Sequence, residues 1–237
     1  MITIPTSELI GGLSDVLPHV TDPNGSLAGV ALAWDGTALK FSVYDVLSGV
    51  TVHWVPGEGD ESEVDDDEDP AVEDLAWGGD DDPWATFLGY AQVKEIVKVF
   101  RLPAKLWRVP VRVKCSPTGD RVTVERDDGP RVGRHLQVPA DPSVLSHIPD
   151  VRSIAYALDR SDPAFTPPEF AAYRLAAFGA GRGHGVLQLN LGAMDEPVGV
   201  TMGNRLAGFI YRTGAKNVRR FNVLRDGAGV TVGGGND

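Results

Sequence analysis

The chain has 237 residues, of which 42% are hydrophobic and 23% charged, and its formal net charge is −11 at pH 7. This length and composition predict a folded protein whose core is large enough for one large or two small domains. The single cysteine, Cys115, excludes an intrachain disulfide framework and a metal site built from several cysteines, and it fits a reducing compartment. The chain opens on no secretory leader pattern and holds no membrane-length apolar run, so the cytoplasm is the expected location.

The charge is distributed unevenly along the chain. Between Glu58 and Asp82 lie 14 acidic residues and no basic residue, so the rest of the chain has a net charge of +3 once these are set apart. Such a stretch has too few apolar groups and too much self-repulsion to pack, which predicts a solvated acidic insert over residues 57–83. The insert lacks the glycine-anchored ligand spacing of an EF-hand loop, so the sequence does not favour a cation site there.

The first predicted unit begins with a short strand at residues 1–4 and a helix at residues 7–19. Ser7 can cap this helix, and its apolar residues recur at helical spacing on one face. Strands are predicted at residues 29–34, 38–46 and 49–55. The pair Asp35-Gly36 indicates a hairpin between the first two of these strands.

The second unit has a helix at residues 92–102, whose apolar face includes Val93 and Ile96. Four cations occupy the opposite face at positions i, i+4, i+7 and i+11, namely Lys94, Lys98, Arg101 and Lys105. A basic row of this kind is either an ordinary solvated helix face or a binding face. Strands are predicted at residues 108–115 and 121–126, with a turn at Thr118-Gly119-Asp120 between them.

Residues 127–165 are rich in turn signals and predict a connector, with one short element at residues 151–158. The third unit opens with a capping box at Thr166 and Glu169 and a helix at residues 168–178. A strand at residues 186–191 follows, and Gly203-Asn204 between two apolar runs predicts a closing hairpin. The three helices start about 80 residues apart, which indicates repeated units.

Catalytic and metal-binding patterns are weak. The five histidines stand apart without paired metal-ligand spacing: His19, His53, His135, His147 and His184. The glycine-rich residues 179–183 follow a helix and lack the ending of a phosphate loop, so they predict a helix end. The sequence therefore predicts no enzyme, no metal and no cofactor, although a pocket that gathered His135, His147 or His184 with carboxylates would revive an enzymatic reading.

In this order of elements the sequence resembles the DNA sliding clamps, specifically the bacterial DNA polymerase III beta subunit. The closing residues 196–212 carry much of the resemblance, because a Pro-Val run leads there into a strand, a turn and a final apolar strand. The likeness covers most of residues 1–214. It implies an α+β fold of repeats in which one helix packs on antiparallel strands. It also implies a non-enzymatic processivity factor of DNA replication, a ring that encircles double-stranded DNA without reading its sequence and tethers a polymerase.

In such rings the helices line the central hole and offer Lys and Arg to the phosphate backbone. The resemblance assigns this role to the cations of the second and third units: Lys94, Lys98, Arg101, Lys105, Arg174 and Arg182. It also implies that a polymerase and a clamp loader dock through short apolar peptides, with Leu206, Phe209 and Tyr211 as candidates for the pocket. Those three residues can equally be strand core. The first helix departs from the family pattern because it carries no Lys or Arg.

The predicted organisation is a clamp-like domain at residues 1–138 with two units and the insert 57–83, a clamp-like C-terminal unit at residues 166–214, and a tail at residues 215–237 that is first basic and then glycine-rich. Residues 139–165 are either a connector or a reduced fourth unit. A fourth unit would make a two-domain clamp, for which the family norm is a trimeric ring, so a homo-oligomer is expected. The alternative is a protein-interaction or regulatory module that keeps the clamp fold without encircling DNA.

Overall fold

The computed structural model describes residues 1–45, 48–57, 77–79, 82–102, 109–126, 133–158, 172–179, 186–191 and 197–211. Its first half consists of β1 (Ile2–Pro5), α1 (Thr6–Val16), the 3₁₀ helix η1 (Leu17–His19), β2 (Gly29–Trp34), β3 (Leu39–Asp45), β4 (Ser48–Trp54), β5 (Gly78–Gly79), β6 (Trp84–Gly89) and α2 (Tyr90–Phe100). Its second half consists of β7 (Pro110–Cys115), β8 (Arg121–Arg126), β9 (Arg134–Pro139), the 3₁₀ helix η3 (Pro142–His147), α3 (Val151–Leu158), α4 (Ala172–Gly179), β10 (Leu187–Leu191), β11 (Val198–Met202) and β12 (Leu206–Ile210).

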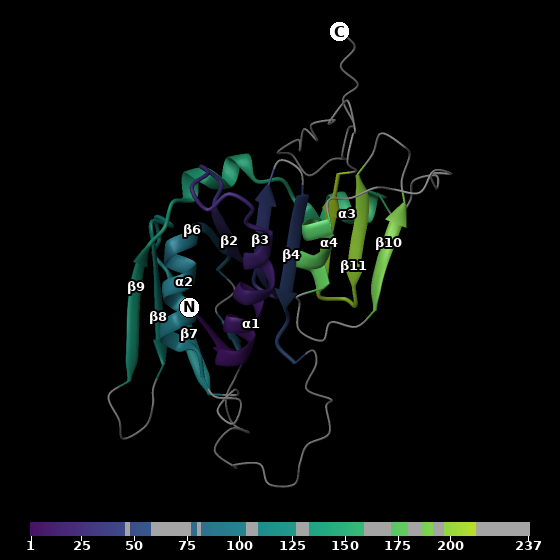
Figure 1. Ribbon diagram of the computed structural model, residues 1–237. Helices are drawn as coiled ribbons and strands as arrows, with labels where there is room; N and C mark the ends of the chain where they lie inside the picture. The colour runs from purple at the N-terminus through teal and green to yellow at the C-terminus, as the bar shows by residue number, and fades with distance from the viewer. Residues whose placement is uncertain are drawn as a thin grey trace.

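The strands form two antiparallel sheets, and the fold is of the α+β class, as predicted (Figure 1). Sheet A has the strand order β5-β1-β7-β8-β9, and sheet B has the order β10-β11-β12-β4-β3-β2-β6. A strand, a helix and three strands follow one another twice, first in β1 to β4 and again in β6 to β9. Each of these two units places its first strand in the sheet that holds the other three strands of its partner, so the two units share one core.

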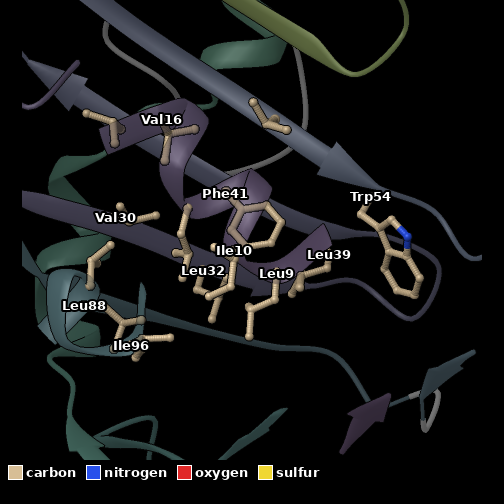
Figure 2. Close-up of a cluster of buried hydrophobic side chains, with 14 of the residues drawn as sticks. Leu9, Ile10, Val16, Val30, Leu32, Leu39, Phe41, Trp54, Leu88 and Ile96 are labelled. Carbon is tan, nitrogen blue, oxygen red and sulfur yellow. The ribbon is translucent and has the colours of Figure 1, made fainter. Parts of the chain in front are cut away.

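Helices α1 and α2 lie side by side against the sheets (Figure 1). Helix α1 packs on β3 and β4, while α2 packs on β2, β6 and β9. Their apolar faces meet the inward side chains of the strands, as the close-up of Leu9, Leu32, Phe41 and Ile96 shows (Figure 2). Gly12 permits this contact, because a β-carbon there would lie only 2.6 Å from the ring of Phe41.

The C-terminal strands extend sheet B, because β12 pairs with β4 from Leu206↔Val52 to Ile210↔Ser48. Helices α3 and α4 cover opposite faces of this part of the sheet. Phe178 of α4 packs over Gly208 in the main core, whereas Val151 of α3 packs with Phe209 on the other face. The β11–β12 hairpin is therefore joined to the first unit by a continuous sheet, and α4 is joined to it by a shared core.

Several predicted elements agree closely with the structure. Strands β2 and β8 and helix α3 have the predicted bounds, and both hairpins form, with Trp34 paired to Leu39 and Met202 paired to Leu206. Gly203 adopts the positive φ of 56° that its turn requires. Cys115 is half-buried at the end of β7.

Other predictions were wrong or incomplete. Ser7 is not the cap of α1, since the helix starts at Thr6, whose hydroxyl donates to the carbonyl of Val109 at 2.6 Å. Strand β6 was not predicted, and β9 lies where the sequence indicated a connector. Strand β9 is a sheet edge with one buried side chain, Val138, so it shows little of the alternation that marks a strand. The capping box at Thr166 and Glu169, most of the acidic insert and the tail at residues 215–237 lie outside the described residues.

Candidate nucleic-acid interface

Helix α2 presents a row of cations to solvent. Val93, Ile96 and Phe100 are buried on its packing face. Lys94 and Lys98 of the helix and Arg101, its C-cap, are exposed on the other face, so the predicted row forms, with the exposed carboxylate of Glu95 beside it. Lys105 of the predicted set lies outside the described residues.

Contacts within and around α2 hold this face in place. The Lys94 ammonium lies 5.3 Å from the ring centroid of Tyr90, one turn earlier, which is a cation–π geometry. At the C-terminal end, a guanidinium NH of Arg126 donates to the carbonyl of Phe100 at 3.3 Å, and Arg134 donates to the carbonyl of Val99. These bonds satisfy carbonyls that a helix end leaves unpaired and put positive charge at the negative end of the helix dipole.

Arg134 is a cation near this face that the sequence analysis missed. Its side chain is exposed at the start of β9, beside the last turn of α2. The residue falls in the stretch that was interpreted as a connector. An arginine at the start of an edge strand gives no sequence signal of its contact with a helix 35 residues earlier.

Helix α1 carries no cation, as the sequence indicated, and its charged residues are the acidic Glu8 and the buried Asp15. Glu8 forms an ion pair with Arg205 of the β11–β12 turn. Arg205 also donates to the carbonyl of His53 at 3.3 Å. Glu8 therefore ties the first helix to the C-terminal hairpin.

Arg174 does not extend the exposed basic row, contrary to the expectation from the sequence. Its side chain is only 9% exposed and pairs with Asp45 at 3.2 Å, while it donates to the hydroxyl of Ser48 at 3.1 Å. Asp45 also accepts from the hydroxyl of Thr21. Arg174 thus joins α4 to the end of the β3–β4 pair. Arg182 lies outside the described residues.

The three candidates for a peptide pocket are core residues. Leu206, Phe209 and Tyr211 are 2%, 1% and 7% exposed. Leu206 faces the main core, while Phe209 and Tyr211 lie under α3 with their ring centroids 5.9 Å apart. Burial, and then the neighbouring Tyr44, raises the pKa of Tyr211 above its usual value. The alternative reading of these residues as strand core matches their placement.

The described histidines stand apart. His19 is buried, His53 lies 3.1 Å from a guanidinium nitrogen of Arg152, and His135 pairs with Glu125 at 3.3 Å on the surface of β9. His184 lies outside the described residues. No group of three His, Cys, Asp or Glu side chains in the described ranges could hold a metal ion, and no helix there is long and apolar enough to cross a membrane.

Comparison by sequence finds no matching family model and no matching curated protein. Comparison by structure does find similar proteins. The DNA polymerase III subunit beta of Pseudomonas aeruginosa superposes with a TM-score of 0.55 at 13% identity, covering 91% of this chain and 65% of that one. The beta subunit of Thermotoga maritima gives 0.58 at 10% identity, and that of Streptococcus pyogenes gives 0.55 at 10%. This chain has the fold of the DNA sliding clamps.

About nine tenths of the chain superposes on each of these beta subunits. The chain covers 65% of the length of each of these three proteins, which is less than two thirds. At 10 to 13% identity the likeness concerns the fold, so the activity of the chain has to be argued from its own residues.

Proposed function

We propose that this protein is a sliding-clamp-like processivity factor that contacts or encircles duplex DNA through the exposed face of α2 and tethers a polymerase. The observation that supports this most is a clamp fold whose second helix presents Lys94, Lys98 and Arg101 to solvent. The proposal includes no chemical reaction. Its setting is DNA replication in the cytoplasm.

The geometry of the row suits a phosphate backbone. From Lys94 to Arg101 the helix rises by about 10 Å, which is close to the axial rise of three phosphates on one strand. Flexible side chains along one side of a helix can follow such a backbone but offer no fixed donor pattern for base edges. Contacts of this type give affinity that depends on salt and not on sequence.

Charge reversal tests this assignment. The variant Lys94→Glu/Lys98→Glu/Arg101→Glu should stay folded, because all three side chains are exposed. We expect the variant to lose DNA binding at moderate salt. At low salt, its slope of log K against the logarithm of the salt concentration should be smaller than that of the parent by about 0.9 for each phosphate contact removed. Fluorescence anisotropy with duplexes of two unrelated sequences measures both quantities.

A matched pair of double variants supplies the control. Lys94→Glu/Lys98→Glu changes the α2 face, whereas Lys114→Glu/Arg121→Glu changes the face of sheet A that points away from α2, and both change the net charge equally. We expect the control to bind DNA like the parent. Equal losses in the two double variants would show that net charge, and not the α2 face, governs binding.

We further propose that copies of the chain associate head to tail through strands β9 and β10. These are edge strands of sheet A and sheet B, and they lie at opposite ends of the molecule (Figure 1). The edge strand β6 is partly covered, because the amide of Asp141 donates to the carbonyl of Phe87 at 2.9 Å. Beside β10, Val186 is 78% exposed, and within it Leu189 is 40% exposed, which suits an interface.

The solution mass tests the association. Light scattering on a sizing column should give a mass that is a whole-number multiple of 25.3 kDa, as a closed ring requires. The variant Val186→Lys/Leu189→Lys should have the mass of the monomer. A parent protein that stays monomeric at every concentration would exclude a ring made of this chain alone.

A second function is a clamp-fold module that binds protein partners and does not encircle DNA. One observation favours it: of helices α1, α2 and α4, only α2 presents a row of cations among the described residues. A monomeric mass combined with unchanged DNA affinity in the α2 triple variant would support this alternative.

A further inference from the structure

The face of sheet A that points away from the helices is positively charged. On β7 and β8 the valines at positions 111, 113, 122 and 124 are buried, so the alternate residues face solvent. These include the cations Arg112, Lys114 and Arg121 and one acidic residue, Glu125. We refer to these four residues as the outer face of sheet A.

The cations of this face are poorly matched within the described part of the chain. Glu125 lies directly across from Arg112, but its carboxylate pairs with His135 on the other side at 3.3 Å. The side chains of Arg112 and Lys114 make no hydrogen bond or ion pair with any described residue. The face therefore has a net positive charge that is available to an anionic group.

The acidic insert is attached at the edge of the same sheet. Strand β5, which lies within the insert just after the acidic segment 58–76, pairs with β1, and the register places Gly78, Thr3 and Arg112 in one row across three neighbouring strands. Two strand spacings, about 10 Å, therefore separate Gly78 from Arg112. Pro56, which precedes the insert, lies against Gly78. A β-carbon added to Gly78 would be 3.3 Å from the Cγ atom of Pro56. The described residues that flank the acidic segment 58–76, Pro56 and Gly78, thus lie at the edge of sheet A, and Gly78 is in the same row as Arg112.

We infer that the acidic segment 58–76 docks on the outer face of sheet A of its own chain, where its carboxylates pair with Arg112 and Lys114. The segment has 11 acidic residues and no basic residue, so its charge is complementary to that of the face. A short tether of this kind gives an effective concentration in the millimolar range. This inference does not depend on the proposed function.

The basic face of α2 is a less favourable site for the same segment. Helix α2 packs on the inner side of the molecule against β9, which is four strands, or about 19 Å, from β5 in sheet A. Each exposed ion pair contributes at most about 1 kcal/mol, so the docking needs several pairs at once and should weaken as salt rises.

Zero-length coupling of carboxylates to lysines with a carbodiimide, followed by proteolysis and mass spectrometry, tests the inference on the full chain. We expect Lys114 to couple to the segment 58–76, with a yield that falls at least several-fold between about 20 mM and 500 mM salt. Lys94 and Lys98 are also exposed and serve as internal controls with low yields. In a mixture of ¹⁵N-labelled and unlabelled protein, the products that join Lys114 to the segment should form within one chain only.

Preferential coupling of the segment to Lys94 or Lys98 would overturn the inference, as would Lys114–segment products that join labelled and unlabelled chains. Variants supply a second test that keeps Lys114 as the reporter. Arg112→Glu/Arg121→Glu should reduce the Lys114 yield several-fold, whereas Lys94→Glu/Lys98→Glu, with the same change in net charge, should leave it unchanged. An equal Lys114 yield in both variants would also refute the docking site.

Discussion

The burial of His19 predicts a loss of stability in mild acid. His19 ends η1 and meets Phe178 of α4 edge to face, with ring centroids 4.4 Å apart. Its side chain is 3% exposed, and its Nε2 has no hydrogen-bond partner among the described residues. Burial lowers the pKa of His19 from 6.5 to about 4. The imidazole is therefore neutral where α4 packs on the first unit.

The direction and size of the effect follow from proton linkage. Because the pKa is lower in the folded protein, the unfolded chain binds more protons in acid, so the contribution is fully present above pH 6.5 and is lost as the pH falls towards 4. A pKa change from 6.5 to about 4 corresponds to a total of about 3 kcal/mol. Between pH 7 and pH 5 the expected loss is about 2 kcal/mol.

Urea unfolding at pH 7 and pH 5 measures the loss, and His19→Phe isolates it. The variant keeps an aromatic partner for Phe178 and removes the titrating group, so its stability should fall by about 2 kcal/mol less than that of the parent. Carboxylates titrate in both proteins and cancel in the comparison. His147→Phe, at an exposed position, should behave like the parent. Equal pH dependence in the parent, His19→Phe and His19→Gln would refute the argument.

Three further predictions follow from other buried contacts. Arg174→Met should lower the free energy of unfolding by about 2 kcal/mol, because it breaks a largely buried ion pair, while DNA affinity measured by anisotropy stays unchanged. Gly208→Ala should cost at least about 2 kcal/mol in urea unfolding, because its β-carbon would lie 2.7 Å from the Phe178 ring. Burial, and then the charge of Asp120, raises the pKa of Cys115, so a chromogenic disulfide reagent at pH 8 should modify it more slowly than an exposed thiol, and Asp120→Asn should speed the reaction.

The elements that the sequence predicted well are those with a strong local signal. Strand β2 and its hairpin combine an apolar run with Asp35-Gly36, where Gly36 has a φ of 95° and the Asp35 carboxylate accepts the amides of Thr37 and Ala38. Turn chemistry of this kind is contained within a few residues. Strands β6 and β9 lack such signals. Their positions depend on pairing with β2 and β8, which no local pattern reveals.

The exchange of first strands between the two N-terminal units was also beyond a reading of the sequence. Repeated units of one helix and several strands are visible in the periodicity, but the partner of each strand is not. Strand β1 pairs with β7 more than 100 residues later, and Thr6 next to it donates to Val109 at a separation of 103 residues. Contacts of this range are decided by how the apolar faces of both units fill one core.

The charged residues show the same limit at the candidate site. The row of Lys94, Lys98 and Arg101 could be assigned to an exposed face because the helical period that positions these residues also positions the buried Ile96 between them. Arg174 has the same kind of side chain on a similar helix, yet its charge is taken up by Asp45, 129 residues earlier in the chain. A cation can be placed on a helix face from its own neighbourhood, but whether its charge remains available to DNA depends on carboxylates that only the folded chain brings near. For that reason the proposed DNA contact depends on α2, where the structure shows the charges exposed, and not on the number of basic residues in the sequence.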